Sequence, residues 1–297
     1  MRILIENYNT VTSTEATYFH NCLIQAGVEV SMWNPEIDKI AVFDLFDQVD
    51  PDVFLTHYTK LTPEVIKRLG KGSCQLVLNV SGIEKNSAEN LEQELAAGNV
   101  KTKFFFYNRV KPEGLTTKCI EIMPGADIFL GFSQPSPRQI PWATVSDSPV
   151  DVGDDFEVYH NISTSPAYEG DLQLDLPTLS QKLSLYRNVR IHGDPDYVIS
   201  QLFLDCAVRT HGKTTIKLTD ENQAEVTAFF MRILPDLPAG DGATVYIKST
   251  ILSKHSCFNR AERLAKQLGM DETVNNLREI QNSIRNQIQD EKSEQNS

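Results

Sequence analysis

Three histidines close short apolar runs of this sequence, and that position makes them the first candidates for chemistry. His57 ends the run Val53–Thr56, and His160 and His192 end apolar runs in the second half. Open α/β sheets bind ligands at the carboxyl ends of their strands. A neutral imidazole there can accept a proton from a hydroxyl or donate to a phosphate, given its ordinary pKa of roughly 6.5. We predict His57 as the first candidate for a general base, with a purely structural role as the alternative for each histidine.

Other polar residues follow the same predicted strands. In the first half, Glu6 closes the opening apolar run and is the second candidate for the base. In the second half, the polar residues at strand ends are Tyr159, His160, Asn161, His192 and Gly193. Asp205 stands inside an apolar helical segment, where it lies either on the solvated face or against a ribose. These residues predict ligand binding at one edge of each sheet.

The common catalytic signatures are absent from the sequence. It contains no Gly-rich phosphate loop followed by Lys and Ser or Thr, no Gly-x-Ser-x-Gly elbow and no Gly-x-Gly-x-x-Gly fingerprint. The five cysteines are dispersed without paired metal-ligand spacing, and we expect reduced, buried thiols. We therefore predict neither a bound metal nor a cofactor.

The elements that must position these residues alternate strand with helix in both halves. Short, continuously apolar strands separated by helices are typical of a parallel sheet covered on both faces. The strands predicted in the first half are Arg2–Glu6, Val28–Trp33, Val53–Tyr58, Gln75–Val80, Lys103–Asn108 and Ala126–Leu130. The strands predicted in the second half are Glu157–Ser163, Val189–His192 and Thr214–Leu218.

The fold class predicted is α/β, with two Rossmann-like domains and a C-terminal helical extension. Its four parts are a first domain at 1–132, a proline-punctuated linker at 133–154, a second domain at 155–270, and a polar C-terminal helix and tail at 271–297. Two such halves facing each other make a cleft, and clefts of this kind usually hold a nucleotide-bearing ligand.

Composition narrows the functional classes. The 297 residues suit about two domains of roughly 150 residues each. The net charge of −12 argues against a surface that binds nucleic acid non-specifically, although it does not exclude a local basic groove. No apolar run approaches the roughly 20 residues that span a bilayer, and the N-terminus is unlike a signal peptide. We therefore expect a cytoplasmic protein.

Three stretches of the second half carry a family resemblance. They are Tyr159-His160-Asn161-Ile162-Ser163-Thr164, then Ser200-Gln201-Leu202-Phe203-Leu204-Asp205-Cys206-Ala207, and the His-x-x-x-x-Arg-Ala segment His255–Ala261. Together they resemble the C-terminal nucleotide-sugar domain of GT-B glycosyltransferases, particularly the spore-maturation-protein type of group 1. The first half is similar to that family in architecture, as an acceptor domain.

The resemblance implies a metal-independent glycosyltransferase. It would transfer a sugar from a nucleoside diphosphate donor to an unknown hydroxyl acceptor in the cleft between the two halves. The donor-binding residues that it implies are Tyr159, His160, Asn161, His192, Gly193, Gln201 and Asp205, with Asp205 on the ribose. Two alternatives stay open: a non-catalytic nucleotide- or sugar-binding protein of the same fold, and a nucleotide-sugar epimerase.

Overall fold

The computed structural model describes nine segments of the chain, namely residues 1–7, 14–35, 38–108, 111–126, 140–146, 157–160, 186–192, 214–217 and 250–295. They belong to two compact units. The first comprises Met1–Met123 with Arg260–Arg278, and the second Pro124–Asn259 with Glu279–Ser297. Each unit contains one β-sheet, and the two are described separately.

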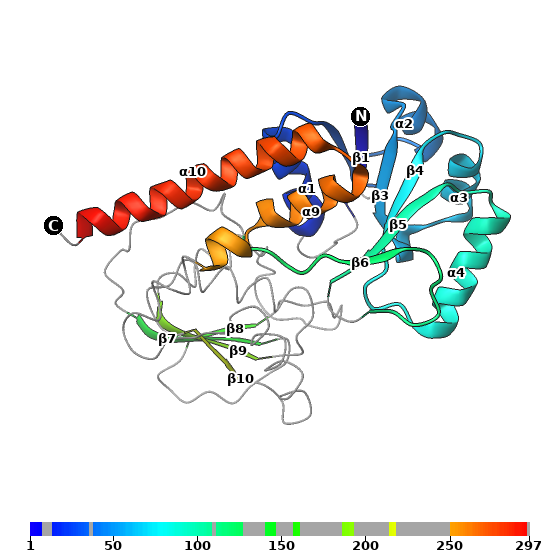
Figure 1. The fold of residues 1–297 in the computed structure, drawn as a ribbon. Helices are drawn as coiled ribbons and strands as arrows, with labels where there is room; N and C mark the ends of the chain where they lie inside the picture. Colours follow the sequence, from blue (N-terminus) through cyan, green and yellow to red (C-terminus); the bar gives the residue numbers. More distant parts are fainter. Residues whose placement is uncertain are drawn as a thin grey trace. The chain divides into compact units, whose positions relative to one another are not determined.

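The first unit is built on a six-stranded sheet in which every strand is parallel to its neighbours, as predicted (Figure 1). The strand order is β2-β1-β3-β4-β5-β6. The strands are β1 (Arg2–Glu6), β2 (Glu29–Trp33), β3 (Val53–His57), β4 (Gln75–Asn79), β5 (Thr102–Tyr107) and β6 (Cys119–Glu121). The first five lie where the apolar runs predict them. The sixth does not, because Ala126 instead forms an isolated bridge with Ser256.

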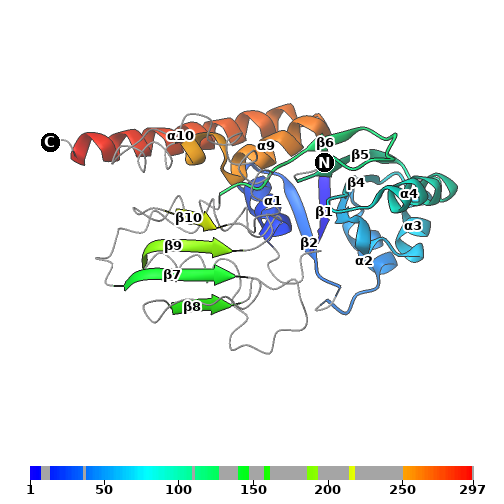
Figure 2. The ribbon, with the colours of Figure 1, turned by 90° about the horizontal axis from the view of Figure 1, so that it is seen from below.

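Helices cover both faces of this sheet. They are α1 (Thr14–Gln25), α2 (Val42–Val49), α3 (Pro63–Gly70), α4 (Lys85–Ala97) and the parts of α9 (Cys257–Leu268) and α10 (Asp271–Gln295) that belong to this unit. Figures 1 and 2 show α2, α3 and α4 on one face, here called the α2–α4 face, and α1 on the other, the α1 face. Phe19 of α1 packs edge-on against Phe106 of β5, with ring centroids 6.1 Å apart.

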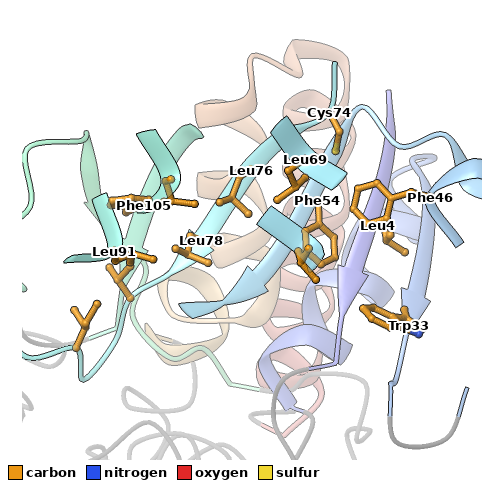
Figure 3. Close-up of a cluster of buried hydrophobic side chains, with 14 of the residues drawn as sticks. Leu4, Trp33, Phe46, Phe54, Leu69, Cys74, Leu76, Leu78, Leu91 and Phe105 are labelled. Carbon is orange, nitrogen blue, oxygen red and sulfur yellow. The ribbon is translucent and has the colours of Figure 1, made fainter. Parts of the chain in front are cut away.

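Burial on both faces explains why the strands are continuously apolar rather than alternating. On the α2–α4 face, a buried cluster joins alternate strand residues to the helices above them (Figure 3). Its strand members include Leu4, Phe54 and Leu78, none of which has exposed area. The intervening residues, such as Ile5 and Leu55, are equally buried and point to the α1 face.

Two helix boundaries follow directly from the sequence. The α2 helix ends at Asp50, whose φ of 45° is the left-handed conformation that Asp tolerates, and Pro51 prevents continuation. The α3 helix begins with Pro63 at its first position, and the side chain of Thr62 accepts a hydrogen bond from the Val65 N–H (3.3 Å).

The second unit contains a four-stranded parallel sheet, in the order β10-β9-β7-β8. Its strands are β7 (Ile140–Ser146), β8 (Glu157–His160), β9 (Tyr186–His192) and β10 (Thr214–Lys217). Read in the opposite direction, this order is β8-β7-β9-β10. It has the same connectivity as β2-β1-β3-β4 of the six-stranded sheet, with the second strand at the edge and the first beside it. Both sheets are therefore Rossmann-like, and the predicted α/β class is confirmed.

Strand β7 corrects one sequence interpretation. Its residues fall inside the range 133–154 predicted as a linker, yet β7 pairs with strands on both sides. The four prolines of that range suggest a connection without regular structure. Pro141, however, stands at the second residue of β7, and proline is tolerated at the start of a strand. Within the described residues, no helix is long and apolar enough to cross a membrane.

Candidate functional site

The six-stranded sheet has a topological switch point between β1 and β3, because the chain moves outward from β1 to β2 and then returns to the far side of β1. Open α/β sheets bind ligands beyond the carboxyl ends of the strands at such a point. Glu6 is the last residue of β1, and Thr56 is next to last in β3. The Thr56 hydroxyl donates to the Glu6 carboxylate, with 2.5 Å between Oγ1 and Oε2. A carboxylate and a hydroxyl are thus joined across the switch point.

Burial gives Glu6 unusual acid–base properties. The residue is 3% exposed. Burial disfavours the ionised form and raises the pKa of Glu6 to about 7, although the Thr56 hydrogen bond and the charge of Lys60 both lower it. Lys60 belongs to the short 3-10 turn Tyr58–Lys60 that follows β3. A carboxyl group with a pKa near neutrality can take up and release a proton in turn, as a general base requires.

His57 lies beside Thr56 but is held differently. Thr59 hydrogen-bonds its Nδ1 through the side-chain hydroxyl (2.8 Å) and the backbone N–H (3.4 Å). Burial lowers the pKa of His57 to about 4, while a hydrogen bond to the Ser81 backbone raises it. The imidazole is therefore neutral at pH 7, and both bonds tether it locally. Along β3, alternation places His57 on the opposite face from Thr56, so the two predicted base candidates are not brought together.

A second polar cluster lies at the same edge of the sheet on the α1 face. Its centre is Glu15, in the first turn of α1, which is 3% exposed. The Asn79 amide at the end of β4 donates to Glu15 Oε2 (2.7 Å). In the amide orientation that satisfies both of its ends, Asn108 donates to Glu15 Oε1 (2.9 Å). Ser81 completes the cluster by donating its backbone N–H (2.9 Å) and its hydroxyl (2.6 Å) to Asn79 Oδ1.

The Glu15 cluster affects what the first βα turn can bind. A helix N-terminus attracts anions, and in many Rossmann-like domains this place binds a phosphate. Here Glu15 already supplies a carboxylate to the first turn of α1, and it is buried against two amides. A second anion beside it would meet like-charge repulsion. This unit is therefore poorly suited to hold a diphosphate at α1.

In the second unit, the register of the strands aligns three of the predicted donor positions. His160 of β8 and His192 of β9 both pair with Ser146 of β7, so they flank it at the carboxyl edge. Lys217 of β10 pairs with His192 in turn. Tyr159 is one residue earlier in β8 and pairs with Val145. The predicted donor residues Asn161, Gly193, Gln201 and Asp205 lie outside the described residues.

Sequence reasoning did not find Thr56, Glu15 or Asn108. For Thr56 a signal existed, because it is the one hydroxyl in an otherwise apolar run before His57. Glu15 follows the start of a predicted helix, where an acidic residue is ordinary, so its burial is not visible in the sequence. Among the described residues, no group of three or more His, Cys, Asp or Glu side chains could hold a metal ion.

Comparison with known proteins gives structural matches only. No protein-family model and no curated protein matches the chain. It is similar to the spinosyn forosaminyltransferase SpnP, with 11% identity over 98% of this chain and 95% of that one, and a TM-score of 0.42. The glycosyltransferase of kitacinnamycin has 10% identity over 90% and 98% of the two chains, with a TM-score of 0.45. The glycosyltransferase VinC, in complex with dTDP, has 11% identity over 95% and 100%, with a TM-score of 0.41.

All three of these proteins are named as glycosyltransferases, which is the class that the sequence resemblance implies. The spore-maturation subgroup stays a prediction. All three TM-scores lie below 0.5 and all identities are near one residue in ten. Substrate and activity are therefore inferred from the residues of this chain.

Proposed function

We propose that this protein is a glycosyltransferase that moves a sugar from a nucleoside diphosphate donor to a hydroxyl acceptor. The first unit would bind the acceptor, and the second unit would bind the donor. The observation that carries the proposal is the buried Glu6 at the switch point, whose pKa is raised to about 7. No role in packing calls for a carboxylate there, since burying a charge opposes folding.

In this proposal Glu6 is the general base. Its carboxylate takes the proton of the acceptor hydroxyl as the hydroxyl oxygen bonds to the anomeric carbon of the sugar. The bond between that carbon and the diphosphate oxygen breaks, and the nucleoside diphosphate leaves with the electron pair. Thr56 supports the base by holding one carboxylate oxygen, which orients the other for the acceptor. A pKa near the working pH suits this role.

His57 is the alternative base, in line with the sequence prediction. Its neutral imidazole is in the correct charge state at pH 7. Against it, Nδ1 already interacts with Thr59, and the ring is also bonded to the Ser81 backbone. These bonds favour a supporting role for His57, in which it anchors the turn after β3. We therefore rank Glu6 first.

The donor half of the proposal rests on the resemblance in the second unit and on strand register. Strand register supports His160 and His192 as donor contacts, because they end strands on either side of the switch point between β7 and β9. Asp205 is proposed to bind the donor ribose through its carboxylate. The Glu15 cluster supports the same division of roles, because it already puts a carboxylate in the first turn of α1, where it would repel a diphosphate.

The first experiment is a thermal-shift screen of the full chain against UDP, dTDP, ADP, GDP and CDP. A ligand that binds only the folded state raises the midpoint of unfolding, so at least one nucleotide should do so. The Asp205→Asn variant should lose most of that shift. A chain that none of the five stabilises would contradict the donor site.

The second experiment separates catalysis from binding. The matching nucleotide sugar is incubated with acceptor candidates, and the release of nucleoside diphosphate is measured. Glu6→Gln should retain the thermal shift and lose turnover, whereas Glu64→Gln, an exposed carboxylate on α3, should retain both. If the wild type binds the nucleotide but never releases diphosphate from any nucleotide sugar, the protein is a binding protein of the same fold.

A further inference from the structure

The indole N–H of Trp33 is a buried hydrogen-bond donor that has no partner. Trp33 is the last residue of β2 and is 7% exposed. Its ring belongs to the apolar cluster of the α2–α4 face, together with Leu4, Phe46 and Phe54. Figure 3 shows the ring at the carboxyl end of β2, with its nitrogen turned away from Leu4 and Phe46. Within the part of the chain that the structure describes, Nε1 makes no hydrogen bond.

An unpartnered buried donor calls for an explanation. A buried Trp N–H usually finds a partner, and leaving it without one costs stability. Packing in the apolar cluster requires only a large apolar ring, which need not carry an N–H. The apolar cluster therefore accounts for the ring of Trp33 but not for its nitrogen.

The register of the sheet places Trp33 beside the proposed base. Trp33 pairs with Glu6 across the parallel strands β2 and β1. Paired residues of adjacent strands project to the same face, and such strands lie about 4.8 Å apart. A buried donor and a buried carboxylate therefore stand next to each other at the switch point.

Asn7 adds a third polar atom at this place. Its backbone N–H donates to the Trp33 carbonyl (2.7 Å), which ties the two residues together beyond the last strand pair. Its side-chain Oδ1 is buried and, like Trp33 Nε1, has no partner among the described residues. One free donor, one carboxylate and one free acceptor thus surround the end of β1.

We propose that Trp33, Glu6 and Asn7 form the acceptor subsite, and that it binds a polyhydroxylated acceptor such as a saccharide. This inference rests on the proposed function and names its acceptor class. A hydroxyl is the neutral group that can accept from the Trp33 N–H and donate to the Glu6 carboxylate at once. A neighbouring hydroxyl of the same molecule would donate to Asn7 Oδ1. Trp33 is a specificity-determining residue in this arrangement, since it fixes the oxygen from which Glu6 takes the proton.

The chemistry of the three groups separates saccharides from other acceptors. A carbonyl or an ether oxygen can accept from Trp33 but has no proton for Glu6 or Asn7. A simple alcohol satisfies Trp33 and Glu6 and leaves Asn7 Oδ1 unpaired. Because a site built for hydroxyls rejects analogues that leave its buried polar atoms unpaired, an O-methylated sugar should bind poorly.

The test uses the full chain labelled with 5-fluorotryptophan. The sequence has two tryptophans, Trp33 and Trp142, so the ¹⁹F spectrum has two resonances, and the Trp33→Phe variant assigns them. The protein is titrated with glucose, galactose, mannose, N-acetylglucosamine and glycerol. We expect a saturable shift of the Trp33 resonance with at least one sugar, and none with the fully O-methylated form of that sugar. If no probe moves the Trp33 resonance, the inference is wrong and a bound water satisfies the indole.

The Trp33→Phe variant provides the second measurement. It should weaken binding of the active sugar by about tenfold, the order expected for one hydrogen bond of the site, while the nucleoside diphosphate thermal shift stays unchanged. Because the phenyl ring is smaller, the free energy of unfolding in urea should fall by no more than about 2 kcal/mol, the cost of the lost volume with no hydrogen bond to lose. A large loss of stability would mean that a protein partner satisfies the indole, and it would overturn the inference.

The two proposals fail in different ways. If the wild type shows no thermal shift with a nucleotide, or no turnover that depends on Glu6, the proposed glycosyltransferase activity is wrong. If both of these persist while Trp33→Phe binds and uses the sugar as well as the wild type does, only the acceptor subsite is wrong.

Discussion

Two buried carboxylates lie at the carboxyl edge of the first sheet, and their surroundings are opposite in character. Glu15, on the α1 face, accepts hydrogen bonds from the amides of Asn79 and Asn108. Glu6, on the α2–α4 face, accepts one from the Thr56 hydroxyl, and the indole N–H in the next strand has no partner among the residues that the structure describes. Both are 3% exposed. The first carboxylate is held in a hydrogen-bond network, and the second has the raised pKa that the proposed base requires.

The comparison shows how hydrogen bonds change the effect of burial on a carboxylate. A buried carboxylate that receives several amide hydrogen bonds contributes to the structure, because each bond offsets the loss of water. For a buried carboxylate with few hydrogen bonds, desolvation disfavours the charged form and raises the pKa. We therefore propose a structural role for Glu15 and the role of general base for Glu6. The same substitution, Glu to Gln, tests both assignments.

The largest expected effect is on turnover. Glu6→Gln removes the proposed base and should lower kcat/KM by about 10²–10⁴-fold, the usual contribution of a general base. Glu15→Gln should leave kcat/KM within about threefold of the wild type whenever the variant is folded, since Glu15 touches no reacting group in this proposal. The measurement is nucleoside diphosphate release under saturating donor. Equal losses in the two variants would erase the distinction between the carboxylates.

The next effect is the pH dependence of stability through Glu6. Its folded pKa of about 7 lies above the ordinary value of 4.5, so folding favours the protonated form. The stability that this adds is fully present below pH 4.5 and is lost as the pH rises to about 7. The loss amounts to about 3 kcal/mol, at about 1.4 kcal/mol for each tenfold change in proton affinity.

The glutamine of Glu6→Gln cannot ionise. The free energy of unfolding of this variant should therefore rise relative to that of the wild type by the same amount between pH 4 and pH 8. Urea unfolding at several pH values measures the gap between the two proteins. A gap that does not change with pH would show that the pKa of Glu6 is not raised.

Glu15→Gln should be destabilising by about 2 kcal/mol at pH 7, because an amide nitrogen replaces one carboxylate oxygen and faces another amide donor. The sign is opposite to that of Glu6→Gln at the same pH. The free energy of unfolding in urea is the readout. Were Glu15→Gln as stable as the wild type, the two amides would not be holding the carboxylate.

The smallest effect concerns His57, because this residue is only half-buried and solvent screening reduces its contribution. Its folded pKa of about 4 lies below the ordinary 6.5, so folding favours the neutral ring. The stability contributed by this preference is present above pH 6.5 and is lost as the pH falls through about 4. His57→Gln should therefore lose less stability than the wild type between pH 6.5 and pH 4, in the opposite pH direction from Glu6. Identical acid profiles for the two proteins would show that the pKa of His57 is not lowered by folding.

Much of the first unit could be predicted from the sequence, because its signals are local. Continuous apolar runs such as Val53–Leu55 can be buried only between two layers of helices, and Thr62-Pro63 marks a helix start wherever it occurs. The strand ends at Glu6 and His57 were predicted for the same reason. In the second sheet, Pro141 concealed a central strand, since proline is a weak guide when it stands at the start of a ladder.

The sequence by itself determined the parallel α/β class, and it placed Glu6 and His57 at the ligand-binding edge. It could not decide which of these two residues is the better candidate for the base. That depends on which side chains meet across strands about 50 residues apart, such as Thr56 with Glu6, and on how fully they are removed from water. Hydrogen bonding and desolvation act through space rather than along the chain, so only the tertiary structure distinguished Glu6, the proposed base, from His57 and from the hydrogen-bonded Glu15.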